Sequence, residues 1–218
     1  MKKIVAVNAS PRTKWNTAAL VREAARGAEG AGAEILHFDL YRLEKYSGCV
    51  SCFACKRAPG EGKCAVKDGL APVLEAIRGA DGLILGTPNY LGEASAAFRA
   101  LYERLVFQSL TYRSEQMCIN DHPIPVLLVI TGNAPEEMYA EGAFYAEMAA
   151  RYVSTLGRYV GGTKLLIAGD TLQVEDYGRY RWTMFDPEAK RARREREFPE
   201  LRARAFELGA EMARNPWQ

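Results

Sequence analysis

Short apolar runs alternate with amphipathic segments along most of the chain. The apolar runs lie at residues 3–9, 34–40, 81–86, 125–131 and 163–168. Most of them are nearly continuous in apolar side chains, which is typical of strands buried on both faces. Apolar side chains at helical spacing separate them, so we expect helices from about residues 16, 68, 95 and 136. Strands that alternate with helices predict an α/β fold in which helices cover both faces of a five-stranded parallel sheet.

Polar residues and glycines suggest where the helices begin and end. Asn16 with Thr17, and Asp68, are candidates for N-caps. Gly27, Gly30 and Gly32 are expected to end the first helix, and the predicted helix from residue 136 extends to residue 159. In a doubly wound sheet, ligands bind beyond the carboxyl ends of the strands. We therefore expect function in the loops at residues 8–17, 87–93 and 131–135.

The composition changes near residue 186. A basic run at residues 190–196 is interleaved with glutamates, and apolar side chains then recur at helical spacing up to residue 212. This pattern predicts an amphipathic C-terminal helix with a solvated charged face. We accordingly divide the chain into a domain of residues 1–185 and a helical extension of residues 186–218. An aromatic segment at residues 177–185 is expected either to pack on the surface or to cover the ligand site of a neighbouring subunit.

Length and charge fit one large domain. The chain has 218 residues, a net charge of +2 and 48% hydrophobic residues. A charge this close to zero gives no indication of a nucleic acid or an anionic membrane as partner. The apolar run after the N-terminus is too short for a signal peptide, and polar residues follow it directly. We therefore expect a cytoplasmic location.

The loop at residues 8–17 has the features of a phosphate site. It leaves a predicted strand and opens a helix, so unpaired backbone N–H groups and the positive end of the helix dipole face an anion. Ser10, Asn16 and Thr17 add neutral donors, and Arg12 adds a positive charge. The alternative is an ordinary turn with a helix cap. The sequence contains no G-x-x-x-x-G-K-[ST] segment, so a P-loop NTPase is not indicated.

Two segments resemble motifs of the flavodoxin-like NAD(P)H-dependent FMN reductases. Residues 8–17 are similar to the phosphate loop of this family, and residues 87–92, Thr-Pro-Asn-Tyr-Leu-Gly, are similar to its flavin-packing segment. Arg99 with Glu103 and Arg104 resembles a third pattern, in which the family usually has Lys at the first position. The resemblance covers about residues 1–170. It implies a flavodoxin-like fold with strand order 2-1-3-4-5.

The resemblance also implies which residues contact FMN. The phosphate would be held by Ser10, Arg12, Asn16 and Thr17. The isoalloxazine ring would be lined by Pro88, Asn89, Tyr90, Leu91 and Gly92. A third contact segment is expected from its position at the end of the fourth strand, and it consists of Thr131, Gly132 and Asn133.

Four of the five cysteines lie in the predicted loop at residues 47–66. Cys49, Cys52, Cys55 and Cys64 have the spacing C-x2-C-x2-C-x8-C. Four thiolates in one loop can hold a 4Fe-4S cluster or a zinc ion, and three cysteines at a spacing of two favour the cluster. The segment resembles that of the iron–sulfur flavoproteins, a branch of the same family whose last spacing is usually shorter. Free redox-labile thiols and zinc are the alternatives.

The motifs together indicate an FMN-dependent oxidoreductase. It would transfer electrons from NAD(P)H or another donor to a flavin, quinone or protein acceptor, through a 4Fe-4S cluster if the cysteines hold one. FMN carries the chemistry, so we assign no catalytic residue to the protein. Two alternatives are a non-enzymatic flavodoxin-like electron carrier and a thiol- or metal-responsive sensor built on a flavin fold. The resemblance further implies a homodimer or homotetramer.

Overall fold

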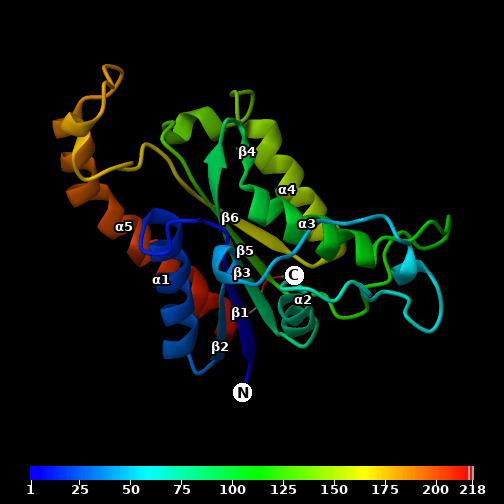
Figure 1. Cartoon of the computed structure of the whole chain (residues 1–218). Helices are drawn as coiled ribbons and strands as arrows, with labels where there is room; N and C mark the ends of the chain where they lie inside the picture. The colour runs from blue at the N-terminus through cyan, green and yellow to red at the C-terminus, as the bar shows by residue number, and fades with distance from the viewer. Residues whose placement is uncertain (216, 218) are drawn as a thin grey trace.

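A parallel sheet forms the centre of the molecule in the computed structural model, which describes residues 1–215 and 217 (Figure 1). Its parallel strands are β1 (Lys3–Asn8), β2 (Glu34–Asp39), β3 (Gly82–Tyr90), β5 (Val126–Thr131) and β6 (Thr163–Ala168). Their order is β2-β1-β3-β5-β6, and the short β4 (Glu93–Ala94) pairs antiparallel with the end of β3. The five parallel strands therefore have the expected 2-1-3-4-5 order, and the doubly wound fold is confirmed.

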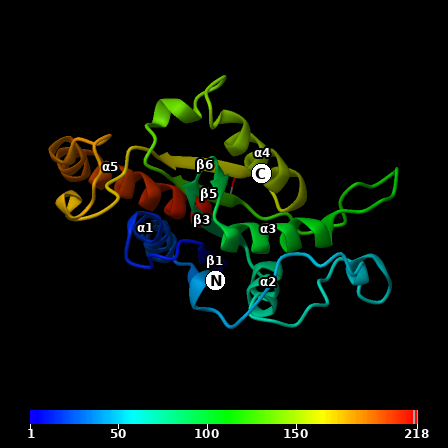
Figure 2. The ribbon, with the colours of Figure 1, turned by 45° about the horizontal axis from the view of Figure 1, so that its top comes forward.

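Helices cover both faces of the sheet (Figures 1 and 2). One face carries α1 (Asn16–Gly30) and α5 (Pro187–Arg214), and the other carries α2 (Ala71–Arg78), α3 (Ala96–Ser109) and α4 (Ala146–Tyr159). Successive side chains of a strand point to opposite faces, so each strand supplies both cores. In β3, Leu83 and Leu85 join the core beneath α2 to α4, whereas Ile84 joins the core beneath α1 and α5.

The C-terminal helix begins where the composition changes. Asp186 caps it, because its Oδ1 accepts hydrogen bonds from the N–H groups of Glu188 (2.9 Å) and Ala189 (3.1 Å). The helix then packs along α1. Of the predicted extension at residues 186–218, residues 216 and 218 lie outside the described residues. The domain boundary at residue 186 stays a prediction.

The crossing of α1 and α5 explains one glycine that was expected to end α1, Gly27, and a second glycine in α5, Gly209. Gly27 lies inside this helix, so that expectation was wrong for it, whereas Gly30 is the last residue of α1 and Gly32 follows it. A Cβ on Gly27 would lie 1.9 Å from the carbonyl oxygen of Phe206 in α5. A Cβ on Gly209 in α5 would lie 1.8 Å from the carbonyl oxygen of Ala24 in α1. Both glycines therefore let the two backbones touch.

Other element boundaries also differ from the expectations. The predicted loop at 87–93 is instead the end of β3 and a hairpin turn to β4, because Asn89 and Tyr90 pair with Ala94 and Glu93. The helix expected from residue 136 begins only at Ala146, after a single 3-10 turn. Short 3-10 helices lie at Leu40–Arg42, Ala54–Lys56, Glu136–Tyr139 and Tyr177–Arg179. Among the described residues, no helix is both long and apolar enough to cross a bilayer.

The N-cap predictions for two helices were also wrong. Trp15 occupies the N-cap position of α1, so Asn16 and Thr17 lie in its first turn. Leu70 precedes α2, and Asp68 makes other contacts, described below. The predicted start of α3 near residue 95 was correct, and Ser95 caps the helix, because its Oγ accepts a hydrogen bond from the Phe98 N–H at 3.3 Å.

Candidate functional site

The three predicted ligand loops meet at the carboxyl ends of β1, β3 and β5. The hydroxyl groups of Thr17 and Thr131 lie 2.7 Å apart and are both buried, which joins the first loop to the third. Ser95 Oγ donates to the carbonyl of Ala9 at 2.6 Å, and the Ser95 N–H donates to Thr87 Oγ1 at 3.0 Å. These bonds join the first loop to the second. The three loops therefore form one continuous site.

The first loop is shaped by short-range hydrogen bonds. The Ser10 N–H donates to Asn8 Oδ1 at 3.1 Å, and the Arg12 N–H donates to Ser10 Oγ at 3.2 Å. Asp39 fixes the Asn8 amide from β2, accepting a hydrogen bond at 2.8 Å. The loop then enters α1, whose first turn receives no side-chain capping bond from the described residues although Asn16 and Thr17 are buried. A buried, uncapped helix N-terminus is a ready-made anion site.

Residues 172 and 173, which follow β6, lie over this loop. The carbonyl of Leu172 accepts hydrogen bonds from Trp15 Nε1 (3.0 Å) and Asn16 Nδ2 (2.9 Å). The carbonyl of Gln173 accepts one from the guanidinium of Arg12. The structure thus directs the Arg12 and Asn16 side chains, both predicted to hold phosphate, toward this covering segment. The Ser10 side chain makes no such contact among the described residues.

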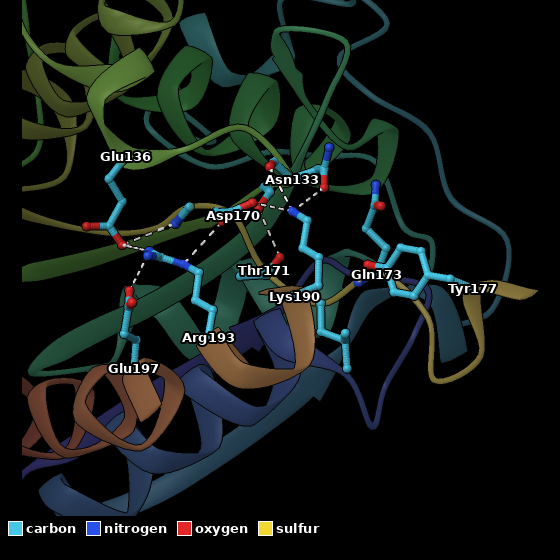
Figure 3. Close-up of polar contacts among 12 residues, drawn as sticks. Asn133, Glu136, Asp170, Thr171, Gln173, Tyr177, Lys190, Arg193 and Glu197 are labelled. Carbon is cyan, nitrogen blue, oxygen red and sulfur yellow. Dashed lines mark hydrogen bonds and ion pairs between the residues drawn. The ribbon is translucent and has the colours of Figure 1, made fainter. Parts of the chain in front are cut away.

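The start of α5 braces the third loop (Figure 3). Lys190 is 6% exposed, and its Nζ donates to Asn133 Oδ1 at 2.7 Å and pairs with Asp170. Arg193 forms ion pairs with Glu136 (3.5 Å) and Asp170 (3.6 Å).

The neighbouring Arg194 reaches the first loop from the same helix. It donates to Asn16 Oδ1 at 2.5 Å and lies over the ring of Phe198. Burial and the nearby Arg202 lower its pKa. The prediction of a solvated basic run at 190–196 was therefore wrong for Lys190, Arg193 and Arg194, which face the two loops.

The second loop is the turn between β3 and β4. Asn89 Nδ2 donates to the hydroxyl of Tyr139 at 2.7 Å, and Asn89 Oδ1 accepts from the Gly92 N–H at 2.9 Å. Leu91 and Gly92 both have positive φ angles, 56° and 85°. Leu91 is completely exposed and Tyr90 is 44% exposed. Two adjacent apolar side chains are thus exposed to solvent beside the candidate phosphate loop at residues 8–17.

Gly132 lies where the second and third loops approach each other. A Cβ at this position would lie 2.5 Å from the Tyr139 hydroxyl and 3.6 Å from the Cβ of Asn89. Its carbonyl accepts a hydrogen bond from Thr171 Oγ1 at 2.9 Å. A glycine is therefore required for this close approach.

A buried tyrosine of α4 supports the β3–β4 hairpin through a hydrogen bond to β4. Tyr152 in α4 is fully buried and donates to Glu93 of β4. Burial, together with the hydrogen bond to Glu93, raises the pKa of Tyr152 to about 12. Burial opposes ionisation of Glu93, but the hydrogen bonds from Tyr152 and Ala94 and the charge of Arg151 outweigh it, so the pKa of Glu93 is lowered. The pair is thus a protonated phenol bonded to a carboxylate.

The four clustered cysteines line one small cavity of about 20 Å³, together with Arg104 and Phe107. Cys55 is buried, Cys49 and Cys64 are partly buried, and Cys52 is exposed; all are free thiols. Burial, with a further contribution from Cys64, raises the pKa of Cys55. In the part of the chain that the structure describes, no three cysteine, histidine or acidic side chains converge closely enough for a single metal ion.

Several residues of these sites were not identified from the sequence. Arg104 was noted only as part of a family pattern, and Asp68 only as a helix cap. Lys190 was assigned to a solvated face, and Leu172 and Tyr139 were not considered. No local signal marks them, because each acts on a segment more than thirty residues away. The charge of Arg104, between Leu101 and Leu105 on the apolar face of α3, was the one available indication.

Comparison with known proteins agrees with this geometry. The family model of the NADPH-dependent FMN reductases matches residues 2–136. An iron–sulfur flavoprotein of Methanocaldococcus jannaschii is 37% identical over 102 residues, which are 47% of this chain and 51% of the relative. One of Archaeoglobus fulgidus is 34% identical over 104 residues, or 47% and 48% of the two chains. The chain spans about half the length of the curated relatives that it matches.

Solved structures share the whole fold at low sequence identity. An NAD(P)H:quinone oxidoreductase from Methanothermobacter marburgensis has a TM-score of 0.66 and 18% identity, covering 97% of this chain and 96% of its own. An FMN-dependent NADH-azoreductase from Bacillus anthracis, solved in complex with FMN, has a TM-score of 0.65 and 11% identity, with coverages of 97% and 99%. The chain belongs to the NADPH-dependent FMN reductase family and, within it, is similar to iron–sulfur flavoproteins.

Proposed function

We propose that this chain is an FMN-dependent oxidoreductase whose flavin lies on the loops that follow β1, β3 and β5. The observation that carries the proposal is the buried N-terminus of α1, which lacks a side-chain cap among the described residues and lies where these loops meet. A helix N-terminus of this kind suits a phosphate held by neutral dipoles. FMN, when bound, supplies the redox chemistry.

The residues of the three loops have distinct roles in this proposal. The Ser10 hydroxyl, Thr17 and the first amides of α1 hold the phosphate, while Arg12 and Asn16 connect the loop to the segment above it. The ring lies against residues 88–92, where Tyr90 and Leu91 offer exposed apolar surface. Residues 131–133 complete the site, and Lys190 keeps Asn133 in place. The protein thereby binds and orients the flavin and excludes water from it.

The four cysteines hold a 4Fe-4S cluster in the same proposal. They line one cavity, which is the arrangement that a shared centre requires. A cubane binds each thiolate to a different iron, so its ligands need not converge on one point as they would around a single ion. The relatives that match about half of the chain carry the name iron–sulfur flavoprotein, which supports this assignment.

NAD(P)H is the proposed electron donor, and a quinone or a protein the proposed acceptor. The family description names NADPH, and a structural neighbour is named a quinone oxidoreductase. The resemblance to this family implies a homodimer or homotetramer, in which a second copy could cover the exposed Leu91 beside the flavin site.

Anaerobically purified protein tests the proposal directly. We expect flavin absorption bands with a broad shoulder near 400 nm, one FMN and about four irons per chain, and steady oxidation of NADPH with a quinone as acceptor. Bound flavin without steady turnover would instead identify a non-enzymatic electron carrier. Colourless protein that takes up neither FMN nor iron after reconstitution would contradict the proposal and favour a thiol-responsive sensor.

A further inference from the structure

The cysteine loop, residues 47–66, is held in place by one helix. Glu103 Oε2 of α3 accepts a hydrogen bond from the Cys49 N–H at 3.2 Å. One turn later, Gln108 Oε1 accepts one from the Cys64 N–H, also at 3.2 Å. Lys56 reaches the end of the same helix and donates to the carbonyl of Leu110 at 2.5 Å. The loop is therefore attached to α3 by hydrogen bonds between side chains and backbone groups, and not by strand pairing.

Arg104 lies at the centre of this contact. It is 2% exposed and is among the largest fully buried side chains of the protein. Its NH1 lies 2.7 and 2.8 Å from the two carboxylate oxygens of Asp68, and its NH2 donates to the carbonyl of Val66 at 2.9 Å. NH1 also lies 3.4 Å from the carbonyl of Ser47. One guanidinium thus bonds both ends of the loop.

The remaining donor of Arg104 is directed at a cysteine. Its Nε lies 3.3 Å from the Sγ of Cys64. A charged donor at this distance fixes the orientation of the sulfur. Hydrogen bonds to cysteine sulfur also raise the reduction potential of an iron–sulfur cluster, because they withdraw electron density from the ligand. Asp68 offsets the buried positive charge, so the guanidinium can remain in the interior.

We propose that Arg104 is the positioning residue of the cysteine centre: it orients the Cys64 thiolate toward the other three cysteines and raises the reduction potential of the bound cluster. This inference rests on the cluster assignment in the proposed function. It also explains the long spacing before the last cysteine. Cys64 follows Cys55 by nine positions, and Arg104, together with Gln108, holds this distant thiol at the cavity that the first three line.

Two substitutions of Arg104 separate positioning from general stability. R104K keeps a positive charge for Asp68 but removes the Nε donor to Cys64, and R104Q removes both. R113Q is the matched control, because Arg113 pairs with Glu61 of the same loop at 2.6 Å but touches no cysteine among the described residues. The measurements are iron and FMN per chain, the midpoint potential of the cluster by redox titration, and the rate of iron loss to a chelator.

We expect both Arg104 variants to keep FMN and to lose iron at least tenfold faster than wild type. The iron that R104K retains should titrate at a lower potential, whereas R113Q should match wild type in every measurement. Wild-type potential and iron retention in R104K would overturn the inference, whether or not R104Q folds. So would wild-type protein that binds FMN but no iron, which would leave the flavin function standing. Absence of FMN with normal iron would contradict the flavin function alone and leave the role of Arg104 intact.

Discussion

The phosphate loop at residues 8–17 and the cysteine loop at residues 47–66 obtain their shapes in different ways. The phosphate loop runs directly from β1 into α1, and its turn is closed by the nearby Asn8 and Ser10. The cysteine loop contains only one 3-10 turn, and side-chain bonds to α3, about forty residues later, hold it in place. The first loop depends on local geometry, and the second depends on a distant helix.

The two loops also differ in how deeply their side chains are buried. Ser10, Asn16 and Thr17 are each at most 3% exposed, whereas Cys52 is exposed and Phe53 is 46% exposed. The phosphate loop has a second brace in residues 172–173 and α5. A loop held from two sides should tolerate the loss of one contact, whereas a loop held mainly by one helix should be more sensitive to the loss of Arg104, which contacts both of its ends. The Arg104 substitutions described above test the cysteine loop, and the predictions below test the proposed phosphate loop and the elements that surround it.

The largest effect is expected where α1 and α5 touch. In G209V the new side chain would meet the carbonyl oxygen of Ala24, which lies 1.8 Å from the Cβ position and belongs to a helix backbone that cannot give way. We expect a loss of about 3 kcal/mol in the free energy of unfolding, the upper end for overpacking, and weaker FMN binding. Urea denaturation measures the loss.

A glycine in α4 provides the control for G209V. A Cβ on Gly157 has no neighbour within 4 Å, so G157A should instead stabilise the protein by about 0.5–1 kcal/mol, because alanine favours the helix. Equal stabilities of G209V and wild type would show that α5 does not brace the phosphate loop as closely as described.

The next effect concerns the phosphate loop itself. S10A removes a hydroxyl that we expect to bond the FMN phosphate, and a bond to a charged group contributes about 1.5–3 kcal/mol. FMN should therefore bind about 10- to 100-fold more weakly, as measured by fluorescence titration of apoprotein. Riboflavin, which lacks the phosphate, should bind S10A and wild type equally, and iron per chain should not change. An equal loss for both flavins would place the phosphate elsewhere.

A smaller effect is expected from the brace at the third loop. K190M removes the Nζ that contacts Asn133 and Asp170, while keeping the length of the buried side chain. Asp170 is 36% exposed, so solvent screens the pair, and we expect a loss of only about 1–2 kcal/mol in thermal or urea unfolding. In the control R196M, an arginine that is 71% exposed is lost, and stability should be unchanged. Indistinguishable effects of the two substitutions would argue against the brace.

The smallest effect is a pH dependence at the hairpin. The pKa of Glu93 is lowered on folding from its ordinary value of 4.5. A lowered carboxyl pKa gives stability that is present above pH 4.5 and is lost as the pH falls through the folded pKa. Wild type should therefore exceed E93Q in unfolding free energy near neutral pH, and the difference should vanish in acid. Tyr152 keeps its proton throughout, since its pKa is about 12. A difference that persists or grows in acid would rule out this contribution.

Much of the fold could be predicted because it follows from local patterns. Five apolar runs and the helices between them define the parallel sheet, and the turn from β1 into α1, which we propose as the phosphate loop, lies where the sequence predicts it. The starts of α3 near residue 95 and of α5 near residue 186 were predicted as well, because helical spacing and a change in composition are local signals. The extent of β3 was not predictable, because Asn89 and Tyr90 become strand only by pairing with β4.

The sequence by itself therefore determined the strand–helix alternation, the turn from β1 into α1 that we propose as the phosphate loop, and the spacing of the cysteines. Only the tertiary structure decided that Arg104 contacts Cys64, that Lys190 and Arg194 turn inward, and that Gly27 lies inside a helix. The physical reason is the range of the interactions. Periodicity and capping act over a few residues and leave a local pattern, whereas a buried charge or a close backbone approach depends on a partner that folding brings from a distant part of the chain.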